Sequence, residues 1–115
     1  MSESEIDQAI AGMFYDPTMV SENAGVEIIN ASGVFGVGNS LARIISNIGG
    51  HVIVVRNSSK TEKKSSITYT GEKGYTLSRI SKLTGVTPEL YSKDQLADIT
   101  FTIGKDASLV GLLGQ

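Results

Sequence analysis

The segment VEIINASGVFG, residues 26–36, decides the fold because it joins two local patterns. Its β-branched start, residues 26–30, predicts a strand, and residues 31–38 predict a turn punctuated by glycines. Apolar residues then recur at the i, i+3, i+4 and i+7 positions of residues 41–48, which is the spacing of one helix face. A glycine pair at 49–50 ends this helix. A strand, a turn and a helix in this order begin a β-α-β unit.

Three further strands and one further helix are expected downstream. Residues 51–56 contain four consecutive β-branched apolar residues, a run typical of a short strand buried on both faces. A polar loop at 57–66 precedes a short strand at 67–70. The helical spacing of the apolar residues in 77–83 predicts a second helix. Residues 99–103 alternate apolar side chains with threonine, which predicts a strand with one buried face.

The resulting order, β-α-β-β-α-β, predicts an α+β fold of two layers. In the ferredoxin-like split βαβ arrangement, this order gives a four-stranded sheet with two helices on one face. A small flavodoxin-like sheet would share the first βαβ unit. The loop at 57–66 is long enough for a hairpin but too short for a crossover helix, which favours the split βαβ arrangement.

Composition excludes several classes of protein. A chain of 115 residues has the length of a single domain, and 40% hydrophobic with 19% charged residues is a globular balance. There is no cysteine and only one histidine, which excludes disulfides, thiolate metal sites and sites with several histidines. No apolar run approaches the roughly 20 residues of a spanning helix, and the acidic first residues are unlike a signal peptide.

Charge is distributed unevenly along the chain. Residues 1–24 contain five acidic and no basic residues, residues 25–106 contain all ten basic residues, and residues 107–115 are uncharged. A charge step that coincides with a change of pattern predicts a boundary. We therefore expect an acidic connector at 1–24 with a short amphipathic helix over about 5–14, an α/β domain at 25–106 and an uncharged tail at 107–115.

An ordered set of motifs in residues 25–106 resembles a known family. The set begins with VEIINASGVFG at 26–36, continues through the helix at 41–48 and the strand GHVIVV at 50–55, and closes with ADITFTIGKD at 97–106. In this order the motifs resemble the LytR C-terminal domain. Ala31 departs from the glycine that is usual in the family.

The resemblance implies a role in the bacterial cell envelope. LytR C-terminal domains follow the LytR–CpsA–Psr catalytic domain in membrane-anchored proteins that attach anionic glycopolymers to peptidoglycan. It therefore implies an extracytoplasmic, non-catalytic accessory domain that binds peptidoglycan, an anionic wall glycopolymer or a protein partner, with the membrane reached only through an upstream anchor. One alternative is a structural module that self-associates or braces the upstream catalytic domain. Another is a small phosphate- or sugar-processing enzyme built on Asn30, Ser32 and the glycine turn.

The turn after the first predicted strand is one candidate ligand site. A strand, a glycine-rich turn and a helix N-terminus can together hold an anion, because free N–H groups point at the gap. Its candidate ligand-binding residues are Asn30, Ser32, Gly33 and Gly36. Alternatively, the glycines permit a positive φ, and Asn30 and Ser32 tie the turn together by hydrogen bonds to its backbone. The glycine spacing matches neither a dinucleotide fingerprint nor a P-loop.

A basic run is the second candidate site. Its candidate residues are Arg56, Asn57, Lys60, Lys63 and Lys64. Positive side chains gathered in one loop attract the phosphates of wall polymers or of anionic lipid, and the alternative is a solvated loop. No nucleic acid is expected, because aromatic residues do not interleave with the basic ones and the net charge is −2.

Other polar residues do not form a catalytic set. The tyrosines Tyr69, Tyr75 and Tyr91 could stack on sugar rings or lie half-buried at sheet edges. Turn capping is the expected role of Asp94 and Asp98. The lone histidine, at the start of a predicted strand, is expected to be a packed or edge residue rather than a general base. We therefore expect no catalytic residue, no metal site and no cofactor.

Overall fold

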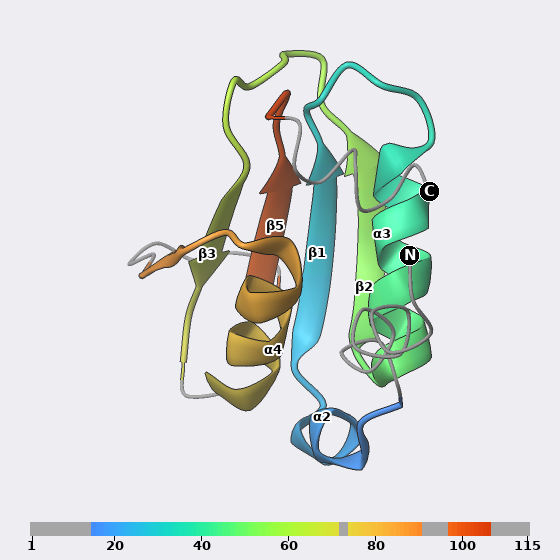
Figure 1. Ribbon diagram of the computed structural model, residues 1–115, viewed down its shortest axis with the longest axis vertical. Coiled ribbons are helices and arrows are strands. Elements are labelled where there is room, and N and C mark those ends of the chain that lie inside the picture. The colour runs from blue at the N-terminus through green and yellow to red at the C-terminus, as the bar shows by residue number, and fades with distance from the viewer. Residues whose placement is uncertain (1–14, 72–73, 91–96, 107–115) are drawn as a thin grey trace, which may run out of the picture.

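The computed structural model describes residues 15–71, 74–90 and 97–106 (Figure 1). The elements in these residues, in chain order, are α2 (Pro17–Glu22), β1 (Gly25–Asn30), α3 (Val37–Ile48), β2 (His51–Asn57), β3 (Ser66–Tyr69), α4 (Gly74–Thr84), β4 (Pro88–Leu90) and β5 (Ile99–Ile103). The helix expected over about 5–14, Tyr91, Asp94 and the tail at 107–115 lie outside the described residues.

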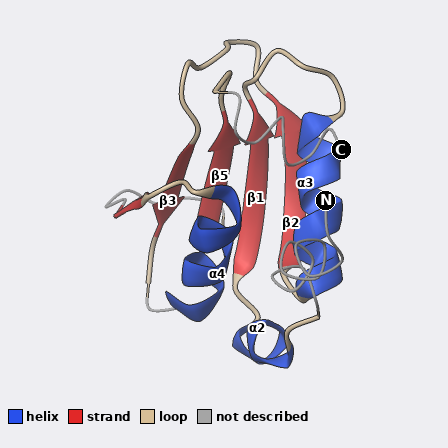
Figure 2. Cartoon of the chain, viewed as in Figure 1, coloured by secondary structure: helices blue, strands red, loops and turns tan. Residues whose placement is uncertain are grey.

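The strands form one mixed sheet in the order β2-β1-β5-β3-β4. Strand β1 pairs in parallel with β2 and β5, β3 is antiparallel to β5, and β4 is parallel to β3. Helices α3 and α4 cover one face of the sheet (Figure 2), because a single buried cluster receives Leu41 and Ile45 from α3 and Leu77 and Ile80 from α4. The α+β class predicted from the sequence is confirmed.

The sheet differs from the predicted one in strand number and order. It has five strands instead of four, because Pro88–Leu90 adds an edge strand that the sequence did not reveal. The ferredoxin-like order is wrong, since β1 and β2 are direct neighbours with no strand between them. The loop after β2 is not a hairpin, because it passes the ends of β1 and β5 before it enters β3 (Figure 1).

Chain length permits this crossing without a helix. Eight residues, 58–65, separate β2 from β3, and an extended segment of that length reaches about 26 Å. Three inter-strand spacings of about 4.8 Å amount to only about 14 Å. A loop of this size therefore allows either a hairpin or a crossing over two strands, and its length alone does not distinguish them.

The core lies between the helices and the central strands. The fully buried residues of the sheet are Val26, Ile28, Ile67, Ile99, Phe101 and Ile103. Strand β2, expected to be buried on both faces, is instead an edge strand in which Ile53 is 43% exposed. The strand order places β2 at the edge, where one side has no neighbouring strand in the described residues. A bulge also lies in this strand, because the pairing passes from Val52 to Val54 and leaves Ile53 as an extra residue.

Part of the acidic segment packs onto the domain. Met19 of α2 is 1% exposed, and Ala24, just before β1, is buried in the same core as the sheet. Helix α2 lies beside the start of α4, at the end of the sheet where β1 begins (Figure 1). The described part of the predicted connector is thus joined to the fold by burial, despite the charge step. None of the described helices has the length and apolar character needed to cross a membrane.

Candidate functional site

Two loops meet at the end of the sheet where β1, β2 and β5 terminate. We call residues 31–36 the glycine turn and residues 58–65 the crossing loop. Because these three strands are parallel, their carboxyl ends share one edge of the sheet (Figure 1). Ser58 donates its backbone N–H to the carbonyl of Asn30 at 2.9 Å, and Glu62 donates its N–H to the carbonyl of Ala31 at 2.8 Å. The two candidate sites of the sequence therefore lie side by side.

The glycine turn is held by Asn30 and Ser32. The Asn30 carboxamide oxygen accepts hydrogen bonds from the Ser32 N–H at 3.1 Å and the Ser32 hydroxyl at 2.6 Å. Asn30 Nδ2 donates to the Val34 carbonyl at 2.9 Å, and the Val34 N–H donates to Ser32 Oγ at 3.0 Å. Both polar side chains are buried. The alternative in which these residues tie the turn together matches this geometry, and they act on the turn rather than on solvent.

The same hydrogen bonds fix an apolar tip. Val34 is 47% exposed and Phe35 is 97% exposed, the highest value among the large hydrophobic side chains described. Gly33 and Gly36 flank the tip with φ angles of 79° and 86°, which only glycine adopts easily. The sequence interpretation missed Phe35, although an aromatic residue between two turn glycines, outside any helix or strand period, was a usable signal.

The crossing loop is anchored at its far end by Asp106. The Ser65 hydroxyl donates to Asp106 Oδ1 at 2.6 Å and accepts the Gly104 N–H at 2.9 Å. Burial acts to raise the pKa of Asp106, but the hydrogen bonds from the Ser65 hydroxyl and N–H outweigh it, so that the pKa lies below its ordinary value of 3.8. The ionised carboxylate therefore holds the loop.

Close backbone contact adds to this anchoring. A Cβ at Gly104 would overlap the carbonyl carbon of Lys64 and lie 2.7 Å from the Ser65 nitrogen. Lys105 also donates its N–H to the Glu62 carbonyl at 2.8 Å. Only glycine lets β5 approach the loop this closely.

The positive charges of this end differ in their surroundings. Arg56 Nε lies 2.9 Å from Oε2 of the buried Glu27, whose other oxygen accepts the Thr100 hydroxyl at 3.2 Å. Part of the Arg56 charge therefore compensates a carboxylate of the sheet. Lys60, Lys63 and Lys64 are exposed on the crossing loop. These three lysines and the exposed Lys105, more than Arg56, give this end its outward positive charge, which the exposed Glu62 reduces.

Three open hollows are lined by most of the predicted site residues, but the glycine turn and the lysines line different ones. A hollow of about 220 Å³ is lined by Asn30, Gly33, Val34, Phe35, Asn57 and Ser58. A hollow of about 310 Å³ beside it is lined by Ile29, Arg56, Asn57, Ser58 and Ser59. A third, of about 870 Å³, is lined by Thr61, Glu62, Lys63, Lys64, Ser65, Ser66, Glu89 and Thr102. Of the predicted residues, Ser32, Gly36 and Lys60 line none of these three.

Ser32 and His51, which could act as nucleophile and base only side by side, lie at opposite ends of the sheet. His51 pairs with Gly25 at the start of β1, whereas Ser32 follows the end of that strand. Five residues of strand, from Gly25 to Asn30, span about 17 Å, and this length lies between His51 and Ser32. No group of three or more histidine, aspartate and glutamate side chains in the described residues could hold a metal. Asp98, for which turn capping was expected, holds a distant strand, since its Oδ2 accepts the N–H of Gly25 at the start of β1 at 2.8 Å.

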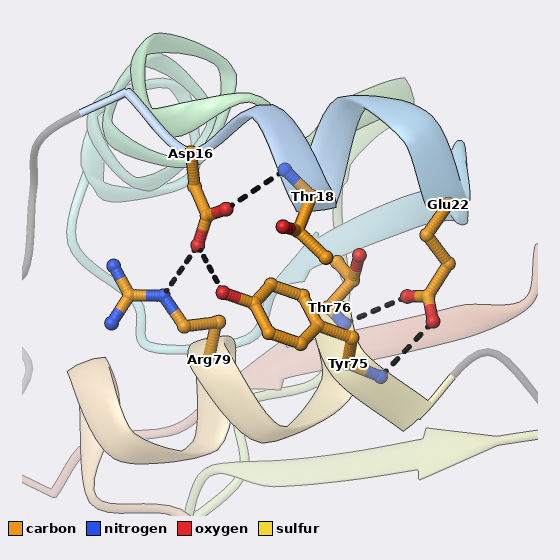
Figure 3. A network of polar contacts seen from close by, with 6 residues as sticks. All are labelled: Asp16, Thr18, Glu22, Tyr75, Thr76 and Arg79. Carbon is orange, nitrogen blue, oxygen red and sulfur yellow. Dashed lines mark hydrogen bonds and ion pairs between the residues drawn. The ribbon is translucent and has the colours of Figure 1, made fainter.

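A second polar network joins α2 to α4 at the opposite end of the sheet (Figure 3). Asp16 Oδ1 accepts the Thr18 N–H at 3.0 Å, and its Oδ2 accepts the Tyr75 hydroxyl at 2.7 Å and lies 3.2 Å from Arg79 Nε. The hydrogen bond from Tyr75 lowers the pKa of Asp16, and the same bond raises the pKa of Tyr75. Tyr75, a candidate for sugar stacking, is thus engaged in a joint between two helices.

Glu22 completes this joint. Its carboxylate accepts the N–H groups of Tyr75 at 3.0 Å and Thr76 at 2.7 Å, in the first turn of α4. These N–H groups have no partner within a helix, and a carboxylate there is also favoured by the helix dipole. Sequence reasoning missed this cap, because it comes from another helix.

Comparisons of the chain with family models, curated proteins and solved structures found no match.

Proposed function

We propose that this chain is a non-catalytic, extracytoplasmic binding domain of the bacterial cell envelope, and that its ligand is an anionic wall polymer. The polymer binds where the crossing loop and the glycine turn meet. The observation that carries the proposal is the placement of Lys60, Lys63 and Lys64, exposed on a loop whose backbone is fixed at several points. The resemblance of residues 25–106 to the LytR C-terminal domain supports the cell-envelope context.

Charge supports an anionic ligand. The crossing loop carries three lysines and one glutamate, whereas the whole chain has a net charge of −2. A local excess of positive charge on an acidic chain attracts anions to that surface without attracting them elsewhere. A polymer with a phosphate in each repeat meets several lysines at once, and the individually weak contacts then add.

The geometry of the polar side chains supports binding rather than catalysis. The side chains of Asn30 and Ser32 are engaged with the turn backbone and with each other. The only histidine of the chain lies at the far end of β2 from the glycine turn. A nucleophile held by a nearby base, the usual requirement of hydrolytic acyl transfer, is therefore not assembled from these residues.

Titration with poly(glycerol phosphate), a polymer of the teichoic acid type, tests the proposal. Amide chemical shifts should change in the crossing loop and the glycine turn, and neutral dextran should leave them unchanged. The double variant Lys63→Ala/Lys64→Ala should weaken binding by about tenfold or more, with a smaller salt dependence. Arg43→Ala/Lys82→Ala removes two exposed charges from α3 and α4 and is the matched control. Equal losses in the two double variants, or shifts elsewhere on the surface, would contradict the proposal.

A further inference from the structure

Phe35 is the feature of this end that an anionic ligand alone does not explain. It is 97% exposed at the tip of the glycine turn, next to Val34. Its backbone is held in place, because the N–H and carbonyl of Val34 bond to the buried side chains of Ser32 and Asn30. An aromatic side chain on a fixed loop loses little freedom when a ligand covers it. The turn is thus built to present an apolar ring.

The loop that carries the lysines touches the turn that carries Phe35. A Cβ at Gly33 would lie 3.3 Å from the methyl group of Thr61, which stands between Lys60 and Lys63 on the crossing loop. The hollow of about 220 Å³ beside Phe35 also receives Asn57 and Ser58, where β2 passes into that loop. A polymer that lies across both loops can therefore touch the ring, the amide and hydroxyl groups beside it, and the lysines of the neighbouring hollow.

We propose that Phe35 is a stacking platform for a sugar ring, so that the polymer bound here alternates sugar rings with phosphates. This inference rests on the proposed function and narrows its ligand. The apolar CH face of a sugar ring packs on an aromatic face, its hydroxyl groups suit the Asn57 carboxamide and the Ser58 hydroxyl, and the lysines face the phosphates. A glycosyl phosphate polymer satisfies all three kinds of group, whereas a bare polyphosphate satisfies only the lysines.

A lipid surface fits these observations less well. Aromatic and basic side chains also occur together in proteins that bind anionic membranes. Insertion of Phe35 into lipid would, however, bring the neighbouring Asn57 and Ser58 toward the hydrocarbon, where polar groups without partners are costly. Among the described residues of this end, the exposed large hydrophobic side chains are Val34 and Phe35. The polar lining beside the ring therefore favours a sugar.

The test compares two polymers of equal charge, a poly(N-acetylglucosamine phosphate) and inorganic polyphosphate. Wild type should prefer the sugar polymer, and Phe35→Ala should lose about tenfold in affinity for it, as a truncated aromatic anchor does, while binding of polyphosphate stays unchanged. Phe35→Trp should retain the preference. Tyr15→Ala removes an exposed aromatic residue at the opposite end and should change neither affinity. Melting temperatures should not change in these variants, since both side chains are exposed.

The outcomes separate this inference from the proposed function. If both polymers bind equally and Phe35→Ala has no effect, the stacking platform is wrong and the lysine site stands. If neither polymer binds, both proposals fail. If Phe35→Ala weakens binding to vesicles of anionic phospholipid but not to the sugar polymer, the tip is a lipid anchor and the stacking platform is wrong.

Discussion

The two ends of the sheet use polar networks in opposite ways. At the α2–α4 end, Asp16 and Glu22 turn inward to helix N–H groups and to Tyr75, and the aromatic ring is tied down by its own hydroxyl. At the end formed by the glycine turn and the crossing loop, Asn30 and Ser32 also turn inward, but the tip they hold exposes Phe35. The first network closes a joint, and the second presents a surface.

This difference shows how to recognise a site in a small domain. Networks of hydrogen bonds occur at both ends, at the surface in one and buried in the other, so their presence does not distinguish a binding site from a structural joint. The distinguishing feature is what the network leaves in solvent. At the α2–α4 end the carboxylate of Asp16 is matched by Arg79 and Tyr75 is 41% exposed, whereas at the other end three lysines are exposed and Phe35 is 97% exposed.

The largest effect is expected from a change at the end formed by the glycine turn and the crossing loop. Gly104→Ala places a methyl group against the backbone of Lys64 and Ser65, and the strand and the loop must separate to accommodate it. We expect the free energy of unfolding to fall by about 3 kcal/mol or more in urea denaturation, with loss of polymer binding. Gly74→Ala is the control, because a Cβ there meets nothing within 4 Å. Stability close to wild type in Gly104→Ala would show that the loop does not lie on β5.

A somewhat smaller effect is expected from Asn30→Ala. The change removes the acceptor for Ser32 and the donor to the Val34 carbonyl inside a buried turn. We expect a loss of about 2–3 kcal/mol, because buried polar groups are left without partners. Asn57→Ala, in an exposed position, should cost only about 0.5 kcal/mol or less. Equal stabilities of the two variants in urea denaturation would show that the hydrogen bonds of Asn30 do not stabilise the fold.

The sequence predicted what is local in this molecule. The strands at 26–30, 67–70 and 99–103 and the helices after the first and third strands follow from spacing patterns that a few neighbouring residues carry. The strand order depends on contacts between distant residues, such as the bond from Lys105 to Glu62. No periodicity encodes these contacts, and a loop of eight residues is compatible with both a hairpin and a crossing. The ferredoxin-like prediction was wrong for this reason.

The candidate site shows the same limit. Asn30 and Ser32 were linked to the turn because their side chains reach backbone groups only two to four residues away. The cap from Glu22 to Thr76 joins residues 54 positions apart, and nothing in the local pattern of either segment reveals it. Phe35 was missed for a different reason, since spacing rules describe residues that become buried and Phe35 does not.

Glu22→Ala tests how much the cap at the α2–α4 end contributes to stability. The change leaves the N–H groups of Tyr75 and Thr76 without their carboxylate, and we expect a loss of about 1–2 kcal/mol, as for other helix caps. Glu22→Gln keeps an acceptor but loses the charge, so its loss should be smaller. Polymer binding should not change in either variant, because the site lies at the other end. An effect on binding as large as that of Lys63→Ala/Lys64→Ala would show that the two ends are not independent.

The smallest effect is expected from the hydrogen bond between Tyr75 and Asp16. The stability that this bond contributes should decrease at both acid and alkaline pH. This bond lowers the pKa of Asp16 from 3.8, so the stability it contributes is present above that value and is lost as the pH falls through the lower pKa of the folded state. It raises the pKa of Tyr75 from 10.0, so the contribution is present below that value and is lost as the pH rises through the raised pKa. The bond lies at the surface, where water screens it, so each change should be slight.

Subtracting the stability of Tyr75→Phe from that of wild type at each pH isolates this bond. Urea denaturation across the pH range should give a difference that is constant between about pH 5 and 9 and declines on both sides. Asp106 and Ser65 are present in both proteins, so their acid dependence cancels in the subtraction. Arg79 also attracts Asp16, and it remains in the variant. A difference that declines only on the alkaline side would therefore mean that Arg79, rather than the tyrosine hydroxyl, keeps the Asp16 carboxylate ionised.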